Sequence, residues 1–129
     1  MEFFAKRLRN NARARHAEIA RLLLAARHNA GWSQAVVAHA LGCSQSDLSR
    51  WEQGEKTLDI VEVENLAALY GLNLADFSTI RLVIQRENAR TGAGEFRGRA
   101  LEEVNRVARL KESFKQKRKE RASEGTALT

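Results

Sequence analysis

The sequence is most informative between residues 33 and 56, which read SQAVVAHALGCSQSDLSRWEQGEK. Ser33 and Ser44 are good N-caps for two short helices, and Gly42 stands between these helices. A glycine suits that place because a tight turn requires a residue that tolerates a positive φ. The predicted helices are Gln34–Leu41 and a second helix that runs from Ser44 to Gln53.

The two short helices have one apolar side and one polar side. Two helices cross closely only where small residues meet, and Ala38 lies four residues before Gly42. The apolar positions are Val37, Leu41, Cys43, Leu48 and Trp51. Side chains that can form hydrogen bonds occupy the other positions of the second helix, at Gln45, Ser46, Asp47, Ser49 and Arg50. We therefore expect the apolar set to lie in a core, with Trp32 also in that core, and the polar set to face solvent.

Apolar residues continue at helical spacing on both sides of this segment, while proline is absent and β-branched residues rarely alternate with polar ones. This pattern predicts an all-α fold. The further predicted helices cover residues 2–29 (as one helix or two nearly collinear ones), 59–71, 73–90 and a last segment from residue 96. The clearest boundary is Thr91-Gly92-Ala93-Gly94. We therefore divide the chain into residues 1–90 and a helical extension, residues 91–129.

Positive charge lies at both ends of the chain. Residues 1–32 hold 7 Lys/Arg against 2 Asp/Glu, residues 33–85 hold 3 against 7, and residues 86–129 hold 12 against 7. The ends therefore carry +5 each and the middle carries −4. Basic flanks suit a polyanionic partner, because each neutralised phosphate releases condensed counterions. Charge alone leaves open a second interpretation, in which these are only solvated helix faces.

Several other classes of function have no support in the sequence. No stretch approaches the roughly 18 continuous apolar residues of a membrane span, and no apolar signal-peptide core follows the N-terminus. The single cysteine, Cys43, cannot form an intrachain disulfide, which is consistent with a reducing cytoplasm. His39 lies four residues before Cys43, but the turn at Gly42 separates them, so we expect core packing and no metal site. No phosphate loop or catalytic triad is present either, so we expect no enzymatic activity and no cofactor.

The sequence resembles the lambda-repressor-like helix-turn-helix family, of the Cro and Xre type. The residues that carry the resemblance are Gly31-Trp32-Ser33-Gln34-Ala35, Ala38, Leu41-Gly42, the run from Leu48 to Lys56 and the run from Leu66 to Leu74. The likeness covers roughly residues 15–80. It implies a five-helix DNA-binding domain in that part, within residues 1–90, with helical extensions at the N- and C-terminal ends.

The resemblance also implies roles for individual residues. Gln45, Ser46 and Arg50 would read base edges in the major groove, where Gln pairs with adenine and Arg with guanine. The DNA backbone would be contacted by Gln34, Ser44, Gln53 and Lys56, of which Gln34 would be assisted by the helix dipole. Arg27 and Glu52 would form a structural ion pair that locks the third helix of the domain to the first.

The last predicted helix is basic and amphipathic, with an expected frayed end at residues 122–129. Its apolar side carries Phe96, Ala100, Val104, Val107 and Phe114, and its polar side ends in the basic run 115–121. The simplest interpretation is a solvated helix docked by one apolar stripe. The alternatives are a dimerisation arm, a second DNA contact, or a segment that becomes ordered on a protein partner. The basic run 6–15 has the same alternatives.

These inferences predict a sequence-specific transcriptional regulator of bacterial or phage type, working on double-stranded DNA in the cytoplasm, at the nucleoid. It would be a repressor that binds a palindromic operator as a homodimer. We expect no association with a membrane. The expected dimer seam is Phe77, Ile80, Val83 and Ile84. The alternative function is that of an antitoxin-like or scaffold protein whose main role is to bind another protein. The C-terminal helix would then contact that partner.

Overall fold

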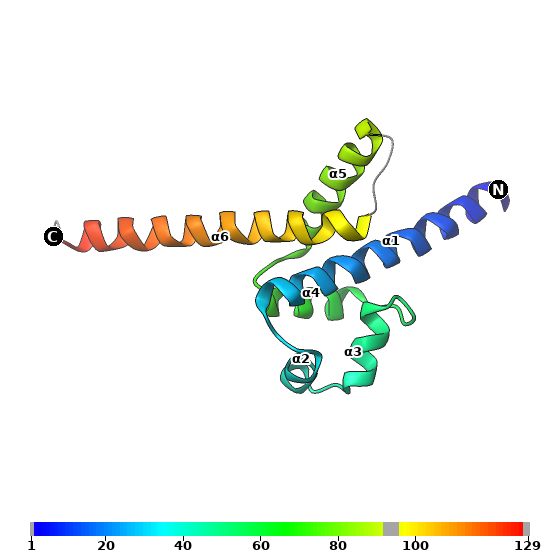
Figure 1. The fold of residues 1–129 in the computed structure, drawn as a ribbon, viewed down its shortest axis with the longest axis horizontal. Coiled ribbons are helices and arrows are strands. Elements are labelled where there is room, and N and C mark those ends of the chain that lie inside the picture. Colours follow the sequence, from blue (N-terminus) through cyan, green and yellow to red (C-terminus); the bar gives the residue numbers. More distant parts are fainter. Residues whose placement is uncertain (1, 92–95, 128–129) are drawn as a thin grey trace.

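Six helices form in the part of the chain that the computed structural model describes, residues 2–91 and 96–127. They are α1 (Glu2–Ala30), α2 (Gln34–Leu41), α3 (Gln45–Glu52), α4 (Ile60–Leu69), α5 (Leu74–Thr91) and α6 (Phe96–Ala127) (Figure 1). No strand occurs among these residues. The predicted all-α fold is therefore confirmed.

Local capping explains where the short helices begin. The hydroxyl of Ser33 accepts a hydrogen bond from the Val36 backbone N–H, and the hydroxyl of Ser44 accepts one from the Asp47 N–H. Asp59 forms a reciprocal capping box with Glu62 at the start of α4. These caps satisfy N–H groups that a helix leaves unpaired at its first turn.

Gly42 ends α2 and turns the chain into α3. Its φ of 71° is in the left-handed region, where a side chain would be strained. In this conformation its backbone N–H reaches the carbonyl of His39, while the N–H of Cys43 reaches that of Ala38. The predicted tight turn between the two short helices is therefore observed.

One core joins all six helices. The middle of α1 supplies Leu22, Leu23, Ala25 and Ala26, and α2 to α5 each add buried side chains to the same cluster. The first turns of α6 belong to this core as well, because Ala100 and Val104 are buried in it while Phe96 and Val107 are partly buried against it. Of the predicted apolar stripe of α6, Phe114 stays outside the core and is 60% exposed.

Two expectations about apolar residues are wrong. Val83, one of the four residues of the expected dimer seam, is partly exposed. The other three, Phe77, Ile80 and Ile84, are buried in the core of the chain itself, because α6 and α1 pack against α5. A second copy therefore cannot reach them. Trp32 was expected in the core, but it is 38% exposed and packs edge-on against Tyr70, with 6.4 Å between the ring centroids. Trp51, by contrast, is buried as predicted.

Both terminal helices extend beyond the core. In Figure 1 the first turns of α1 and the last turns of α6 project in opposite directions, so the two ends of the chain lie far apart. Phe3 and Phe4 are exposed on the projecting part of α1, and residues 112–124 of α6 are all exposed. The helix continues through most of the expected frayed segment, to Ala127. Residues 128–129, like most of the predicted boundary at Thr91–Gly94, lie outside the described residues.

No single helix in the described ranges is long and apolar enough to cross a membrane. Taken together α4 and α5 reach that length and composition, but they are bent by 89° relative to each other.

Candidate DNA-binding interface

The helix α3 has one side fixed in the core and one side open to solvent. Leu48, Trp51 and Glu52 are its buried residues. Gln45, Ser46 and Arg50, the predicted base-reading residues, are all exposed. Because α3 is only two turns long, the buried side chains determine its orientation. The structure thus brings the three predicted residues together on one accessible surface.

A network around Glu52 connects α1, α2 and α3. Its carboxylate accepts hydrogen bonds from Arg27, with Nε to Oε2 at 2.6 Å and Nη2 to Oε1 at 3.1 Å. The third donor of Arg27, Nη1, reaches the carbonyl oxygen of Trp32 at 2.9 Å. Only 3% of the Glu52 side chain and 11% of the Arg27 side chain are exposed. A bidentate, buried pair of this kind fixes the angle between two helices as well as their distance.

Gln34 also belongs to this network. Its amide Nε2 donates to Glu52 Oε1 at 2.7 Å. The resemblance implied that Gln34 contacts a DNA phosphate. The hydrogen bond to Glu52 was not predicted, because no local sequence pattern signals it. An amide NH2 carries two hydrogens, so one remains free to meet a phosphate at the start of α2. The hydrogen bond to Glu52 would hold the amide in place for that contact.

The other predicted backbone contacts lie around the ends of α3. Ser44 accepts the Asp47 N–H at 3.0 Å, which leaves its hydroxyl hydrogen available. Gln53 donates to the hydroxyl of Ser49 at 3.1 Å. Both residues are exposed, as a phosphate contact requires.

Lys56 is held against α3 by two interactions. Its Nζ lies 3.5 Å from Asp47 Oδ1 and 5.5 Å from the ring centroid of Trp51. The ion pair with Lys56 compensates the negative charge that Asp47 places on α3. Both side chains are more than a third exposed, so the pair is weak, and a phosphate can draw Lys56 away at little cost.

Cys43 is placed in the turn between α2 and α3, partly buried against the core. Burial raises the pKa of its thiol, and the nearby Asp47 carboxylate raises it further. His39, four residues earlier, is exposed, so the expected core packing applies to Cys43 alone. Among the described residues no group of three or more potential ligands could hold a metal ion.

Iodoacetamide should alkylate Cys43 slowly at neutral pH, because the thiolate is the reactive form and a raised pKa keeps its population low. The rate should increase as the pH rises through that pKa. We would measure it by mass spectrometry on the native protein and, as a control, on the protein unfolded in guanidinium. Equal rates in the two states at neutral pH would contradict this account of the turn.

Comparison with known proteins agrees with this geometry. A family model described as a helix-turn-helix domain matches residues 18–79, which run from the middle of α1 into α5. Searches of curated proteins and of solved structures gave no match. Residues 18–79 are therefore a helix-turn-helix domain, consistent with the Cro and Xre type, and this domain indicates DNA binding and a role in transcription regulation.

Proposed function

We propose that the protein is a sequence-specific transcriptional regulator, a repressor that binds a palindromic operator as a homodimer. The observation that carries the proposal is the exposed polar row of α3, Gln45, Ser46 and Arg50, on a helix whose other side is buried. A helix supported in this way can enter the major groove without rearrangement. Because its proposed partner is DNA, the protein would act in the cytoplasm, at the nucleoid.

In the proposed complex, contacts to the DNA backbone and to bases have separate tasks. Gln34, Ser44, Gln53 and Lys56 would hold phosphates and so set the register of the protein on the duplex. The exposed row of α3 would then read the base edges. Residues 33–85 carry a net charge of −4, so a large share of the electrostatic affinity would have to come from the basic ends of the chain.

A homodimer would place two copies of α3 about 34 Å apart, one turn of DNA. Since Phe77, Ile80 and Ile84 are buried, the interface must use other residues. The exposed apolar side chains of the projecting part of α6, Leu110 and Phe114, are the candidates that we favour. An interface there would leave α2 and α3 free, because α6 contacts neither helix in the described part of the chain.

The direct test is selection of bound sites from random DNA by the purified full chain, followed by gel shifts with the recovered sequence and with scrambled competitor. We expect a sequence with two inverted half-sites whose centres are one helical turn apart. Recovery of no common sequence, with equal binding to scrambled DNA, would refute sequence-specific recognition.

Arg50→Ala should weaken binding to the selected site by about 1–3 kcal/mol and leave binding to unrelated DNA almost unchanged, because the side chain that pairs with guanine is removed. Binding would be measured by fluorescence anisotropy at fixed salt. Arg86→Ala is the matched control: Arg86 is an exposed arginine on α5, and its removal should leave the ratio of the affinities for the two DNAs unchanged. An equal weakening on both DNAs with Arg50→Ala would mean that Arg50 only positions the protein.

The projecting part of α6 favours a second candidate function, in which the protein mainly binds another protein. Its exposed Leu110 and Phe114 would then contact a partner chain, as in an antitoxin-like or scaffold protein. Purification of the full chain from its own cells would separate the two functions. A stoichiometric second protein, together with no sequence-dependent gel shift, would favour the partner-binding function.

A further inference from the structure

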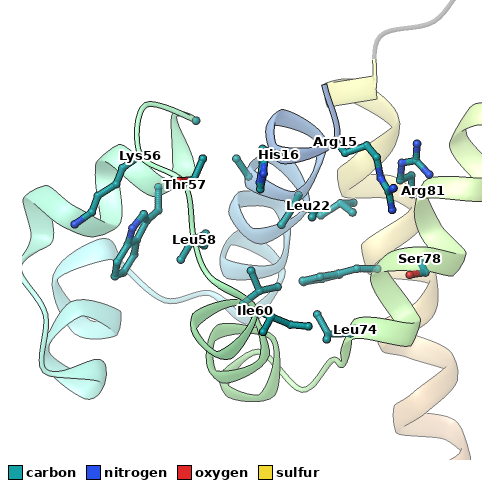
Figure 2. A pocket seen from close by; sticks show the side chains of 16 residues that line it. Arg15, His16, Leu22, Lys56, Thr57, Leu58, Ile60, Leu74, Ser78 and Arg81 are labelled. Atoms are coloured by element: carbon teal, nitrogen blue, oxygen red, sulfur yellow. The ribbon is translucent and has the colours of Figure 1, made fainter. Parts of the chain in front are cut away.

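A groove of about 320 Å³ lies between α1, the loop from Gly54 to Leu58, α4 and α5 (Figure 2). Its floor consists of core side chains, among them Leu22, Val63 and Phe77. Leu58, Ile60 and Leu74 continue the apolar surface toward the opening. The groove belongs neither to the proposed base-reading row of α3 nor to the projecting part of α6.

The charged residues of the groove all have the same sign. Its sixteen lining residues include Arg15, Lys56 and Arg81, and none of them is acidic. This is notable because residues 33–85, which supply most of the lining, contain seven Asp and Glu. In Figure 2 the cationic side chains lie toward the upper edge of the groove, whereas Ile60 and Leu74 lie lower. The groove therefore has an apolar part and a positively charged part.

Arg15 can bind a ligand without breaking an ion pair. Arg81 pairs with Glu18, and Lys56 pairs with Asp47. Arg15 is exposed and has no acidic partner among the described residues. A guanidinium in this state offers a planar pair of donors that matches a carboxylate.

The wall of the groove also contains an unused hydrogen-bond donor. Trp51 lines the groove and is buried, and within the described part of the chain its indole Nε1 has no hydrogen-bond partner. Buried polar groups are nearly always paired in folded proteins. The Nε1 atom is itself buried, so an acceptor could pair with it only by displacing the side chains around it, and the ligand site does not depend on this donor.

We propose that this groove binds a small apolar molecule that carries a single carboxylate. The apolar body would cover the floor, and the carboxylate would meet Arg15 at the positively charged edge. A polyphosphate would not fit the apolar floor, and a cation would be repelled by Arg15, the cation of the groove that no carboxylate neutralises. The site is separate from the proposed DNA contacts except at Lys56, so it can be tested without DNA.

Octanoate is a suitable probe, because it has an apolar chain and one carboxylate and does not absorb where tryptophan emits. The Trp32→Phe protein leaves Trp51 as its single tryptophan, since the chain has two, and Trp32 does not line the groove. We expect a saturable change of Trp51 fluorescence with octanoate, and binding about tenfold weaker for uncharged 1-octanol because it cannot form the charge-assisted hydrogen bonds. Equal affinities for the two probes, or no saturable binding, would overturn the proposal.

Two matched variants locate the binding. Ile60 and Val61 are neighbours in the first turn of α4 and are 65% and 58% exposed, but only Ile60 lines the groove. In the same Trp32→Phe background, Ile60→Glu should weaken octanoate binding at least about tenfold, because its carboxylate repels the ligand. Val61→Glu should bind octanoate like the parent. Equal effects of the two substitutions would place the probe elsewhere and overturn the assignment.

A second copy of the chain is the competing occupant of an apolar groove. Sedimentation of the same two variants tests it without a ligand. If Ile60→Glu, and not Val61→Glu, converts a dimer to monomers, the groove is an interface between copies and the ligand proposal is wrong. An unchanged oligomeric state in both variants, with loss of octanoate binding in Ile60→Glu alone, supports the ligand site.

Discussion

Glu52→Ala should destabilise the protein by about 3–5 kcal/mol, the cost expected when one partner of a buried ion pair is removed. Arg27 would stay in its place with 11% of its side chain exposed and without two of its hydrogen bonds. Gln34 would lose its acceptor as well. Since α1, α2 and α3 meet at this carboxylate, the substitution loosens three helices at once. The free energy of unfolding would be measured by urea denaturation.

Two further variants separate the contributions in this network. Gln34→Ala removes one hydrogen bond to the same carboxylate and should cost only about 1–2 kcal/mol. The double variant Arg27→Ala, Glu52→Ala should lose less stability than the sum of the losses of the two single variants. Each single substitution leaves the other charge without its partner, whereas the double substitution removes both charges. If the Glu52→Ala protein unfolds like the parent but no longer binds DNA, Glu52 acts in DNA binding and the structural role that we assign to it is wrong.

The helix boundaries could be predicted from the sequence because their causes are local. Ser33, Ser44 and Asp59 each cap a helix with an oxygen that reaches the N–H group three residues ahead. Gly42 marks its turn through the conformation of a single residue. Such signals need no knowledge of what packs where, and all of them agree with the structure.

The partners of each apolar face could not be predicted, because they come from distant parts of the chain. The apolar face of α5 is visible in the sequence, but only the structure shows that α1 and α6 cover Phe77, Ile80 and Ile84. Trp32 likewise has an apolar side chain, yet it lies at a loop on the surface. Periodicity identifies which residues share a face and does not say which element lies against it.

The same distinction applies to the candidate site. Helical spacing predicts only that the polar residues of α3 face outward. The resemblance selects Gln45, Ser46 and Arg50 among them, and the structure leaves all three exposed. The hydrogen bond from Gln34 to Glu52 spans 18 residues and has no counterpart in a local pattern. The groove beside α4 is still harder to foresee, since its lining comes from α1, α3, α4, α5 and a loop.

Deleting all of α6 and deleting only its exposed end should have very different effects on stability. A chain that ends at residue 95 loses the buried Val104 and the partly buried Phe96 and Val107. Each fully buried side chain of this kind contributes about 1.5–3 kcal/mol, so the loss is on the order of 5 kcal/mol. A small domain has only about 5–15 kcal/mol in total, and we expect no cooperative thermal transition. A chain that ends at Glu112 should melt like the full chain, because residues 113–124 are exposed and the ion pair of Lys111 with Asp76 is kept.

The function of that exposed end can then be tested in the full-length protein. We expect it to be a dimerisation arm, because the distal turns of α6 extend beyond the core and away from α2 and α3 (Figure 1). The combined substitution Leu110→Gln, Phe114→Gln should therefore produce monomers in sedimentation and make DNA binding depend more steeply on protein concentration. The matched control replaces Lys115, Lys117 and Lys119 by Gln and should leave both properties unchanged, because it removes charge and keeps the apolar residues.

A direct contact of this end with DNA would reverse that pattern. The lysine variant would then flatten the dependence of binding on salt by about 0.9 log unit for each phosphate that the protein no longer neutralises, while the apolar variant would keep it. The protein that ends at Glu112 completes the test, because it lacks both Phe114 and the five Lys/Arg that follow it. If it stays dimeric and keeps the full salt dependence, the part of α6 beyond Glu112 serves neither the dimer nor the DNA. A protein partner would then be the function that its exposed side chains still permit.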